Sequence, residues 1–565
     1  MLRRRARPGA FLRLFASSCR RSSLHPSRPH LPNPTALPPP PVAKKLPFTV
    51  SAHGRSWTDP YHWMRDTSDP DLAALLAAEN TYANAFVGSA GGGALCARLA
   101  AEMRARLPPS AATPPQPWGP WLYYQYVPEG EEYPVLSRKL RPLGGLARAL
   151  LDYLSGLEKE QVLLDWNEVA EKNGYVHIGS CRISPDHRFL AYTVDTSGGE
   201  LFSLEVKDLQ TQNVVFSSPD KGIVSLAWAR SCESLFYTVC DETLRPNQVF
   251  CKKLQSDEPE FLVFTEKDVF VMESDNVREG LWPIRKRVDK VQYFLEHHNG
   301  FFYILTNAPV NGTEPTTEGY YLARCRAEKS LVDRWQTVAF PGSYCTIQDM
   351  DIFHDNLVLF LQKNGTPLFC SIDMPIDDDV QEGKELDDLN PWYFPIPSNL
   401  CSIVPGSNND FISSTYRLVV SSPVVQLLSV GGGGDLSLHL AGTKAKKINS
   451  IQDFAACGMH LIKEGLVHQN RLCAIGCSAG GLLVGAVINM LPDLFSAAVL
   501  KVPFLDICNT MLDPTLPLTV LDYEEFGDPN IPDEFEAICS YSPYDNLSPG
   551  VCYPPVLVTA SFNDT

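Results

Sequence analysis

Residues 471–490 read RLCAIGCSAGGLLVGAVINM, and the Gly-x-Ser-x-Gly pattern from Gly476 to Gly480 inside them decides the fold. A short apolar run, Leu472 to Ile475, precedes the pattern, and a run of small and apolar residues follows it from Gly481 to Met490. A strand, a sharp turn that carries a serine and a helix together form a nucleophile elbow, which lifts the serine hydroxyl clear of a sheet.

The serine of this pattern is the candidate nucleophile. In such a turn Ser478 Oγ is exposed, and the Ala479 N–H points to where an oxyanion would form. We expect side chains at positions 476 and 480 to collide with neighbouring backbone, which would require glycine at both. The five-residue pattern alone is a weak signal, so the interpretation depends on the strand and the helix that flank it.

Length, charge and cysteine usage limit the possible classes of protein. A chain of 565 residues is too long for one core, so we expect two domains. The formal net charge of −17 argues against a nucleic-acid-binding protein and weakly favours cationic partners such as basic peptides. No apolar run reaches the ~18 residues of a membrane span. The 16 cysteines lack metal-ligand spacing and indicate thiols in a reducing compartment.

The first 45 residues have the composition of a leader and a linker. Residues 1–30 hold eight arginines and many serines, and no acidic residue precedes Asp59. This composition is typical of a mitochondrial or plastid transit peptide; the alternative is a disordered tail or a misplaced start codon on a cytoplasmic protein. The proline-rich residues 32–42 predict an extended linker.

Two further regions precede the elbow. Residues 46–107 contain helical patterns at Asp69 to Phe86 and Leu95 to Leu107. Residues 108–405 predict an all-β domain with a tight turn at Ile183 to Arg188, either a propeller of about seven blades or a large sandwich array. Its strands are rich in aromatic and β-branched residues, as at Trp121 to Tyr126, Phe189 to Val194, Ser234 to Val239, Tyr293 to His297, Phe301 to Leu305 and Leu357 to Leu361.

Residues 406–565 change to an alternation of helices and strands. We expect Ser450 to cap a helix that runs through Leu461 and ends before Gly465. The elbow follows, and further strands are expected at Ala497 to Val502 and Pro555 to Ala560. Strands that alternate with helices predict a parallel sheet.

Six stretches of the chain resemble the prolyl oligopeptidase family of serine peptidases, and its oligopeptidase B branch above all. They follow the family's order: Asp59 to Trp63, Gly432 to Asp435, Gly476 to Gly481, Tyr523 to Pro529, Tyr541 to Asn546 and Thr559 to Asp564. The resemblance implies a seven-bladed propeller that caps an α/β-hydrolase domain, with residues 46–107 packed beside the latter. It also implies cleavage of short peptides, without a metal or an organic cofactor.

The resemblance also implies roles for particular residues. Ser478 matches the nucleophile, and Asp564 matches the triad aspartate, which lies downstream of the serine in hydrolase order. Asp522 and Glu524 match the acidic pair that holds an Arg or Lys side chain of the substrate, because two carboxylates can pair with a buried guanidinium. Glu525 is a weaker candidate for the same role.

The chain also departs from the family's pattern. The triad histidine should follow Asp564, yet all 12 histidines precede it. We interpret His439, His460 and His468 as ordinary polar or surface residues. The family's arginine before three glycines is replaced by Gly431, and its oxyanion-stabilising tyrosine has no counterpart.

From these departures we infer an internal deletion, with a seam at Gln426 to Val430, and a C-terminal truncation, so that the α/β-hydrolase domain is incomplete. A sheet without its leading strands gains an unpaired edge and loses apolar cover. A serine without a histidine lacks its general base, so the chain as written should hydrolyse peptides roughly thousands of times more slowly.

Three other functions stay open. Cleavage after proline is the close competitor, because only the acidic pair disfavours it. A catalytically inactive propeller scaffold that binds peptides or partner proteins would fit the missing histidine. An esterase or lipase is disfavoured by the long β array before the elbow. We expect short peptides as partners, and neither nucleic acid nor membrane; the physiological substrate and the oligomeric state are not determined by the sequence.

Overall fold

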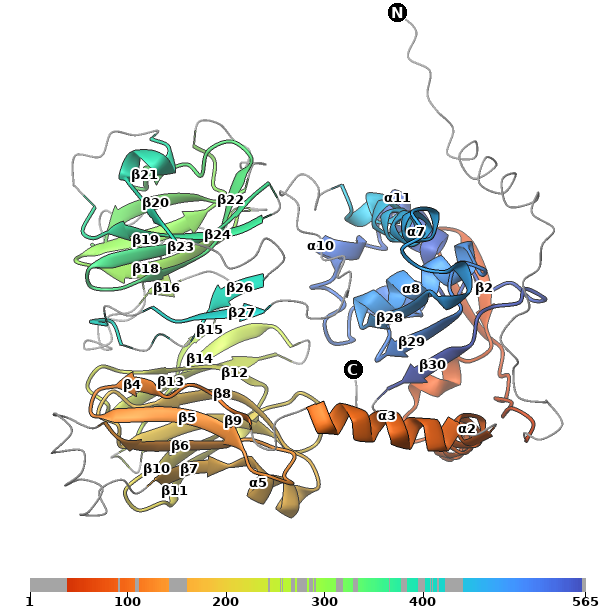
Figure 1. Ribbon diagram of the computed structural model, residues 1–565, viewed down its shortest axis with the longest axis horizontal. Coiled ribbons are helices and arrows are strands. Elements are labelled where there is room, and N and C mark those ends of the chain that lie inside the picture. The colour runs from red at the N-terminus through yellow and green to blue at the C-terminus, as the bar shows by residue number, and fades with distance from the viewer. Residues whose placement is uncertain are drawn as a thin grey trace, which may run out of the picture. The chain divides into compact units, whose positions relative to one another are not determined.

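The computed structural model describes residues 38–560 apart from internal gaps, the longest of which are 142–159, 272–281, 311–318 and 422–440. Most of the expected leader and the whole expected seam, Gln426 to Val430, lie outside the described residues. The chain divides into two compact units, residues 1–108 with 468–471 and the remainder. Figure 1 shows the helices and strands of both units.

The first unit holds a hairpin and two helices. Its elements are β1 (Phe48–Ala52), β2 (Arg55–Asp59), the 3-10 helix η2 (His62–Arg65), α2 (Pro70–Gly88) and α3 (Gly92–Arg106). Asp69 caps α2 by accepting a hydrogen bond from the Asp71 N–H, and Lys44 Nζ lies 2.8 Å from Asp69 and 2.7 Å from Asp71. The two predicted helices are therefore confirmed, and the acidic first turn of α2 complements its dipole.

The second unit begins with a series of antiparallel sheets in which strands adjacent in sequence pair. The first contains β3 (Ala111–Ala112), β4 (Gln116–Trp118), β5 (Trp121–Val127), β6 (Val135–Leu140) and β7 (Gln161–Asp165), and helix α5 (Trp166–Asn173) follows it. Four four-stranded sheets come next: β8 (His177–Ile183), β9 (Phe189–Asp195), β10 (Ser203–Asp208) and β11 (Val214–Lys221); β12 (Ile223–Trp228), β13 (Ser234–Cys240), β14 (Pro246–Lys253) and β15 (Phe261–Thr265); β18 (Tyr293–His298), β19 (Phe301–Thr306), β20 (Tyr321–Arg326) and β21 (Gln336–Ala339); β22 (Cys345–Ile352), β23 (Asn356–Lys363), β24 (Thr366–Asp373) and β25 (Trp392–Tyr393).

These sheets are the blades of a β-propeller, and each of the six predicted strands lies in one of them. The expectation of seven blades is wrong for the described residues, which form five. Two further sheets have two described strands each: β16 (Phe270–Val271) with β17 (Trp282–Pro283), and β26 (Ser402–Pro405) with β27 (Leu418–Ser421). Residues outside the described part of the chain adjoin both of these sheets, so five is the number of blades with four or more described strands.

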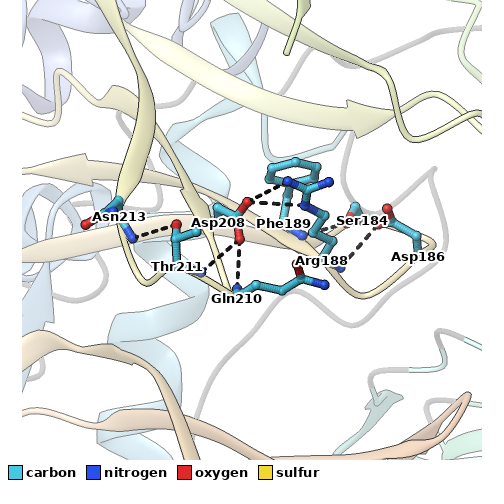
Figure 2. A network of polar contacts seen from close by, with 8 residues as sticks. All are labelled: Ser184, Asp186, Arg188, Phe189, Asp208, Gln210, Thr211 and Asn213. Atoms are coloured by element: carbon cyan, nitrogen blue, oxygen red, sulfur yellow. Dashed lines mark hydrogen bonds and ion pairs between the residues drawn. The ribbon is translucent and has the colours of Figure 1, made fainter. Parts of the chain in front are cut away.

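The predicted tight turn joins β8 to β9. The Ser184 N–H donates to the Phe189 carbonyl over 2.9 Å, and the Phe189 N–H donates back to Ser184 Oγ over 2.8 Å. Figure 2 shows how this turn is tied to the turn between β10 and β11, since Arg188 Nη2 lies 3.0 Å from Asp208 Oδ2. Asp208 Oδ1 accepts a hydrogen bond from the Gln210 N–H over 2.8 Å. Polar side chains thus fix the β8–β9 turn and the β10–β11 turn of one blade.

The blades bury their central strands on both faces. All seven residues of β9 are buried, and Ala191 in it packs in one cluster with Ile223 and Leu235 of the following blade. Burial on both faces explains why the blade strands are near-continuous apolar runs rather than alternating ones.

The elbow belongs to a separate parallel sheet in the last part of the chain. Strands β28 (Cys473–Cys477), β29 (Ala497–Lys501) and β30 (Val556–Thr559) pair in parallel in that order, which confirms the predicted sheet. The helices of this region are α7 (Ile448–Lys463), α8 (Ala479–Met490), α9 (Ile507–Met511), α10 (Tyr523–Phe526) and α11 (Pro532–Tyr541), and the 3-10 helices are η6 (Lys444–Lys446) and η7 (Gln469–Arg471).

The predicted start of α7 is wrong. The helix begins at Ile448, and Lys447 occupies the capping position without a side-chain hydrogen bond. Ser450 lies inside the helix, where its Oγ donates to the Gly442 carbonyl over 3.2 Å. A serine three residues into a helix can thus bond to the preceding segment, and the propensity of serine for helix starts does not distinguish the two cases. Gly465 does follow the end of α7, with a φ of +71°.

Candidate active site

The turn between β28 and α8 has the geometry of a nucleophile elbow. Ser478 adopts φ +51° and ψ −121°, a conformation that costs a side-chain-bearing residue about 1–3 kcal/mol. Its backbone is held on both sides, because the Ser478 N–H donates to the Lys501 carbonyl over 3.0 Å and the Gly481 N–H donates to the Ser478 carbonyl over 2.8 Å. The sheet and the helix together therefore impose the strained turn.

Glycine is required at two positions of this turn, but not at the two that the sequence suggested. A Cβ on Gly476 would lie 2.3 Å from the Gly480 carbonyl oxygen, which confirms the prediction for 476. A Cβ on Gly480 would meet no atom within 4 Å, so the prediction for 480 is wrong. The crowded partner is Gly481, whose added Cβ would lie 2.5 Å from Pro503 Cβ. The clash depends on how α8 packs on the segment after β29, and the local pattern does not reveal that packing.

The reactive groups of the elbow face solvent. Ser478 and Ala479 are both exposed, and the Ser478 side chain does not cap α8, although Ser478 stands at its N-cap position. The first N–H groups of a helix have no partner within that helix and carry its positive dipole end. A negative charge that develops next to Ser478 Oγ would therefore be stabilised by the start of α8, in accord with the role expected for the Ala479 N–H.

The candidate triad aspartate and the three histidines of this region are only partly described. Asp564 lies outside the described residues, five positions after the end of β30 at Thr559. His439 also lies outside them. His460 is exposed, with Nδ1 3.9 Å from Glu464, and His468 Nδ1 accepts a hydrogen bond from the Asn470 N–H over 3.2 Å. These two histidines have ordinary polar partners, as expected from the sequence.

The acidic candidates lie at α10. Asp522 is half-buried at the N-cap position of this helix, and burial, followed by the charge of Glu525, raises the pKa of its carboxyl group. Glu524 is exposed, and its carboxylate lies 3.1 Å from Lys444 Nζ. An exposed pair of this kind contributes at most about 1 kcal/mol to stability, so Glu524 can exchange Lys444 for another cation.

Glu525 has a different environment from its two neighbours. Its carboxylate forms a close ion pair with Lys447, whose side chain is only 12% exposed and whose ammonium lies 5.0 Å from the centroid of the Phe526 ring. Lys447 precedes α7, so this pair joins the start of α7 to α10. Glu525 therefore already has a partner within the protein, as expected of a weaker candidate for substrate binding.

Phe504 connects the elbow with the acidic helix, a role that no sequence pattern predicted. Its N–H donates to the Ser478 carbonyl over 3.2 Å, and its ring packs edge-on against Phe526 of α10 at a centroid distance of 5.6 Å. One residue thus contacts both the candidate nucleophile and the helix that follows Asp522. A signal was nonetheless present, because Pro503 and Phe504 directly follow the predicted strand Ala497 to Val502. Ligands of open α/β sheets bind at the carboxyl ends of the strands.

No helix in the described part of the chain is long and apolar enough to span a membrane. Within the same part of the chain, no group of three metal-ligating side chains gathers.

Comparison with known proteins places both large regions in one family. The family model described as "Prolyl oligopeptidase, N-terminal beta-propeller domain" matches residues 40–282, and the model described as "Prolyl oligopeptidase family" matches residues 415–565. The second model extends over the elbow, the parallel sheet and α10, which identifies this region as an α/β-hydrolase domain.

Individual proteins agree with the family models. "Protease 2" of Moraxella lacunata is 27% identical over 627 aligned positions, which cover 93% of this chain and 89% of that protein. "Prolyl endopeptidase-like" of Homo sapiens is 27% identical and covers 68% of this chain and 67% of that protein. The solved structure of oligopeptidase B from Leishmania major shares the fold with a TM-score of 0.77 at 22% identity, covering 92% of this chain and 90% of that one.

The alignment with Protease 2 is longer than the 565 residues of this chain, so that relative carries internal residues that this chain lacks. This supports the inferred internal deletion. Together, the propeller blades, the strained serine turn on a parallel sheet and the two family models show that the chain belongs to the prolyl oligopeptidase family of serine peptidases.

Proposed function

We propose that the protein is a serine oligopeptidase that cleaves short peptides after Arg or Lys through an acyl-enzyme. The observation that carries this proposal is the elbow itself, which holds Ser478 at φ +51° with its side chain exposed and free of a capping role. Backbone strain of this size persists only where the surrounding structure imposes it, and it concentrates at functional sites.

The chemistry follows from the positions of these groups. Ser478 Oγ attacks the scissile carbonyl carbon, and the Ala479 N–H stabilises the oxyanion that forms. In hydrolase order the general base is a histidine downstream of Asp564, and that histidine is not among the 565 residues; it would take the serine proton and return it to the leaving amine, while Asp564 would orient its ring. Water then hydrolyses the acyl-enzyme with the same histidine as the base.

Charge supports a basic residue at the cleavage position. Residues 502–565 contain eleven Asp or Glu and no Lys, Arg or His. Within this acidic segment Asp522 is half-buried, and Phe504 connects its helix to the Ser478 turn. A partly desolvated carboxylate favours a guanidinium or ammonium group over a neutral side chain. The names of the relatives include both a prolyl endopeptidase-like protein and oligopeptidase B, so the choice of Arg or Lys over Pro depends on these carboxylates.

A serine-reactive fluorophosphonate tests the nucleophile in the full-length protein. We expect one labelled site, which is lost in Ser478→Ala and kept in Ser496→Ala, a serine just before β29 that serves as the control. Labelling that survives Ser478→Ala would remove the assignment.

Synthetic peptides test which residue the protein cleaves after. Matched short peptides with Arg, Lys, Pro or Ala at one position are incubated with the protein, and the products are identified by mass spectrometry. We expect cleavage after Arg and Lys. Cleavage after Pro would instead assign the competing specificity. Binding without cleavage, by protein from a preparation whose Ser478 reacts with the fluorophosphonate, would assign the peptide-binding scaffold.

We also propose that residues 1–45 direct the protein to a mitochondrion or plastid, on the basis of their arginine content and the absence of acidic residues. A fluorescent protein fused behind these residues should enter one of these organelles. Uniform cytoplasmic fluorescence would contradict the proposal.

A further inference from the structure

Two cysteine side chains of the hydrolase region lie in contact. Cys508 Sγ and Cys539 Sγ are 2.8 Å apart, although the residues are separated by 31 positions in the sequence. A covalent disulfide has a sulfur–sulfur distance of about 2.0 Å, so a small side-chain rotation brings these atoms to bonding distance. Cys508 belongs to α9 and Cys539 to α11.

The packing of both helices holds the two sulfur atoms together. Ile507 and Met511 of α9 are buried, and so are Phe535 and Ile538 of α11. Because each thiol sits on a helix whose apolar face is fixed, bond formation requires no movement of the backbone over a long distance. The entropy normally lost in bringing two distant cysteines together has already been lost on folding.

The two thiols differ in their access to solvent. Cys508 is only 2% exposed, while Cys539 is partly exposed. The contact with Cys539, and after it burial, raises the pKa of the Cys508 thiol. Cys539 is therefore the sulfur that an external reagent meets first, and Cys508 is the sulfur that resolves the product. Cys345 and Cys370 of the propeller, by contrast, are both buried in one apolar cluster.

We propose that Cys508 and Cys539 form a thiol–disulfide exchange site, which reacts with a low-molecular-weight disulfide such as glutathione disulfide and becomes a reversible intramolecular disulfide. The Cys539 thiolate attacks one sulfur of the reagent, and the first glutathione leaves as a thiolate. The Cys508 thiol then attacks the Cys539 sulfur, and the second glutathione leaves with the proton of that thiol. Two protein thiols are oxidised and one reagent disulfide is reduced to two thiols, so electrons and atoms balance.

The proposed bond would close a covalent loop that contains the acidic helix α10. Residues 508–539 include all of α10, with Asp522 and Glu524. A cross-link limits the open conformations available to the segment that it closes. We therefore expect oxidation to protect this segment from local opening.

Peptide mapping tests the bond directly. The full chain is treated with glutathione disulfide, alkylated without reduction, and digested with trypsin and an endoprotease specific for Glu. Within residues 502–565 there is no Lys or Arg, so the expected product joins residues 502–524 to the peptide that begins at Ala537, through Cys508 and Cys539. Separate alkylation of both cysteines, a lasting glutathione adduct on Cys539, or a bond to Cys552 would each overturn the proposal.

Variants separate the two steps. Cys539→Ser should abolish the cross-link, and Cys508→Ala should leave glutathione bound to Cys539, because the resolving thiol is gone. Cys552→Ser is the matched control, since Cys552 is exposed and lies in the same C-terminal peptide, and it should not change the cross-link. If Cys508→Ala does not fold, Cys539→Ser still decides the outcome, because a cross-link that persists in it would contradict the assignment.

Limited proteolysis tests the consequence. Cleavage of the native protein after Glu524 or Glu525 should slow severalfold on oxidation and recover with dithiothreitol, while Cys539→Ser should show no change. An equal cleavage rate before and after formation of the mapped disulfide would rule out the expected constraint on α10.

Discussion

The propeller blades and the hydrolase sheet bury their strands to very different degrees. In β23 the five consecutive residues from Leu357 to Leu361 are buried, as is the whole of β9. In β30 all four residues are exposed, and Ile475 of β28 is 67% exposed. The sequences of these strands are equally apolar, so composition does not separate them.

The difference lies in which neighbours a strand needs. A blade is an antiparallel meander whose strands find their partners within a few residues, and the adjacent blade covers its faces. A parallel sheet depends on crossovers and on strands far away in sequence. A gap in the chain would therefore leave the blades intact and remove cover from the hydrolase sheet, where the described strands β28 and β30 expose apolar side chains.

The largest expected effect concerns the turn that this sheet supports. Gly476→Ala places a methyl group 2.3 Å from a backbone oxygen and should cost about 4 kcal/mol or more of stability, with loss of fluorophosphonate labelling. Gly480→Ala is the matched control, because its methyl group meets no atom within 4 Å, and it should change stability by less than about 1 kcal/mol. Denaturant unfolding measures both. Equal effects would contradict the packing of the elbow.

The next effect compares apolar residues of the two regions. Leu359→Ala removes a fully buried side chain from β23 and should destabilise the propeller by about 2–5 kcal/mol. Ile475→Thr replaces an exposed side chain of β28 and should cost less than about 1 kcal/mol while improving solubility. Thermal unfolding and light scattering record the two results. A large loss on Ile475→Thr would show that this face is covered in solution.

The acidic helix provides a kinetic comparison. Asp522→Asn together with Glu524→Gln should raise KM for Arg peptides by about 10- to 100-fold, because charge-assisted hydrogen bonds contribute about 1.5–3 kcal/mol. Glu525→Gln should instead lower stability, since it removes the partner of Lys447, with a smaller change in KM. Initial rates on matched Arg and Ala peptides distinguish these outcomes. A loss shared equally by the Ala peptide would contradict the pocket.

The smallest expected effect is a dependence on pH. Burial and the charge of Glu525 raise the pKa of Asp522, so this carboxylate takes up a proton at a higher pH than an ordinary aspartate does. The neutral form binds a guanidinium more weakly, and KM for Arg peptides should rise as the pH falls through this raised pKa. In Glu525→Gln the rise should shift to lower pH, because one source of the raised pKa is gone. A KM profile that Asp522→Asn leaves unchanged would exclude Asp522 as the titrating group.

Local sequence patterns determined much of this protein. Apolar runs bounded by turn residues located the six predicted blade strands, Asp69 with Pro70 marked the start of α2, and the pattern around Ser478 predicted the elbow. These features depend on contacts between residues close in sequence, such as the bonds of Ser184 with Phe189. Such contacts are present wherever the local sequence is present.

Tertiary structure decided the rest. The requirement for glycine falls on 481 rather than 480 because Pro503 packs against α8. Phe504, which follows β29, joins the Ser478 turn to α10. The pairing of Glu525 with Lys447 and the contact of Cys508 with Cys539 bring together residues 78 and 31 positions apart. No local pattern encodes these distances, because they arise only when separately formed helices pack against one sheet.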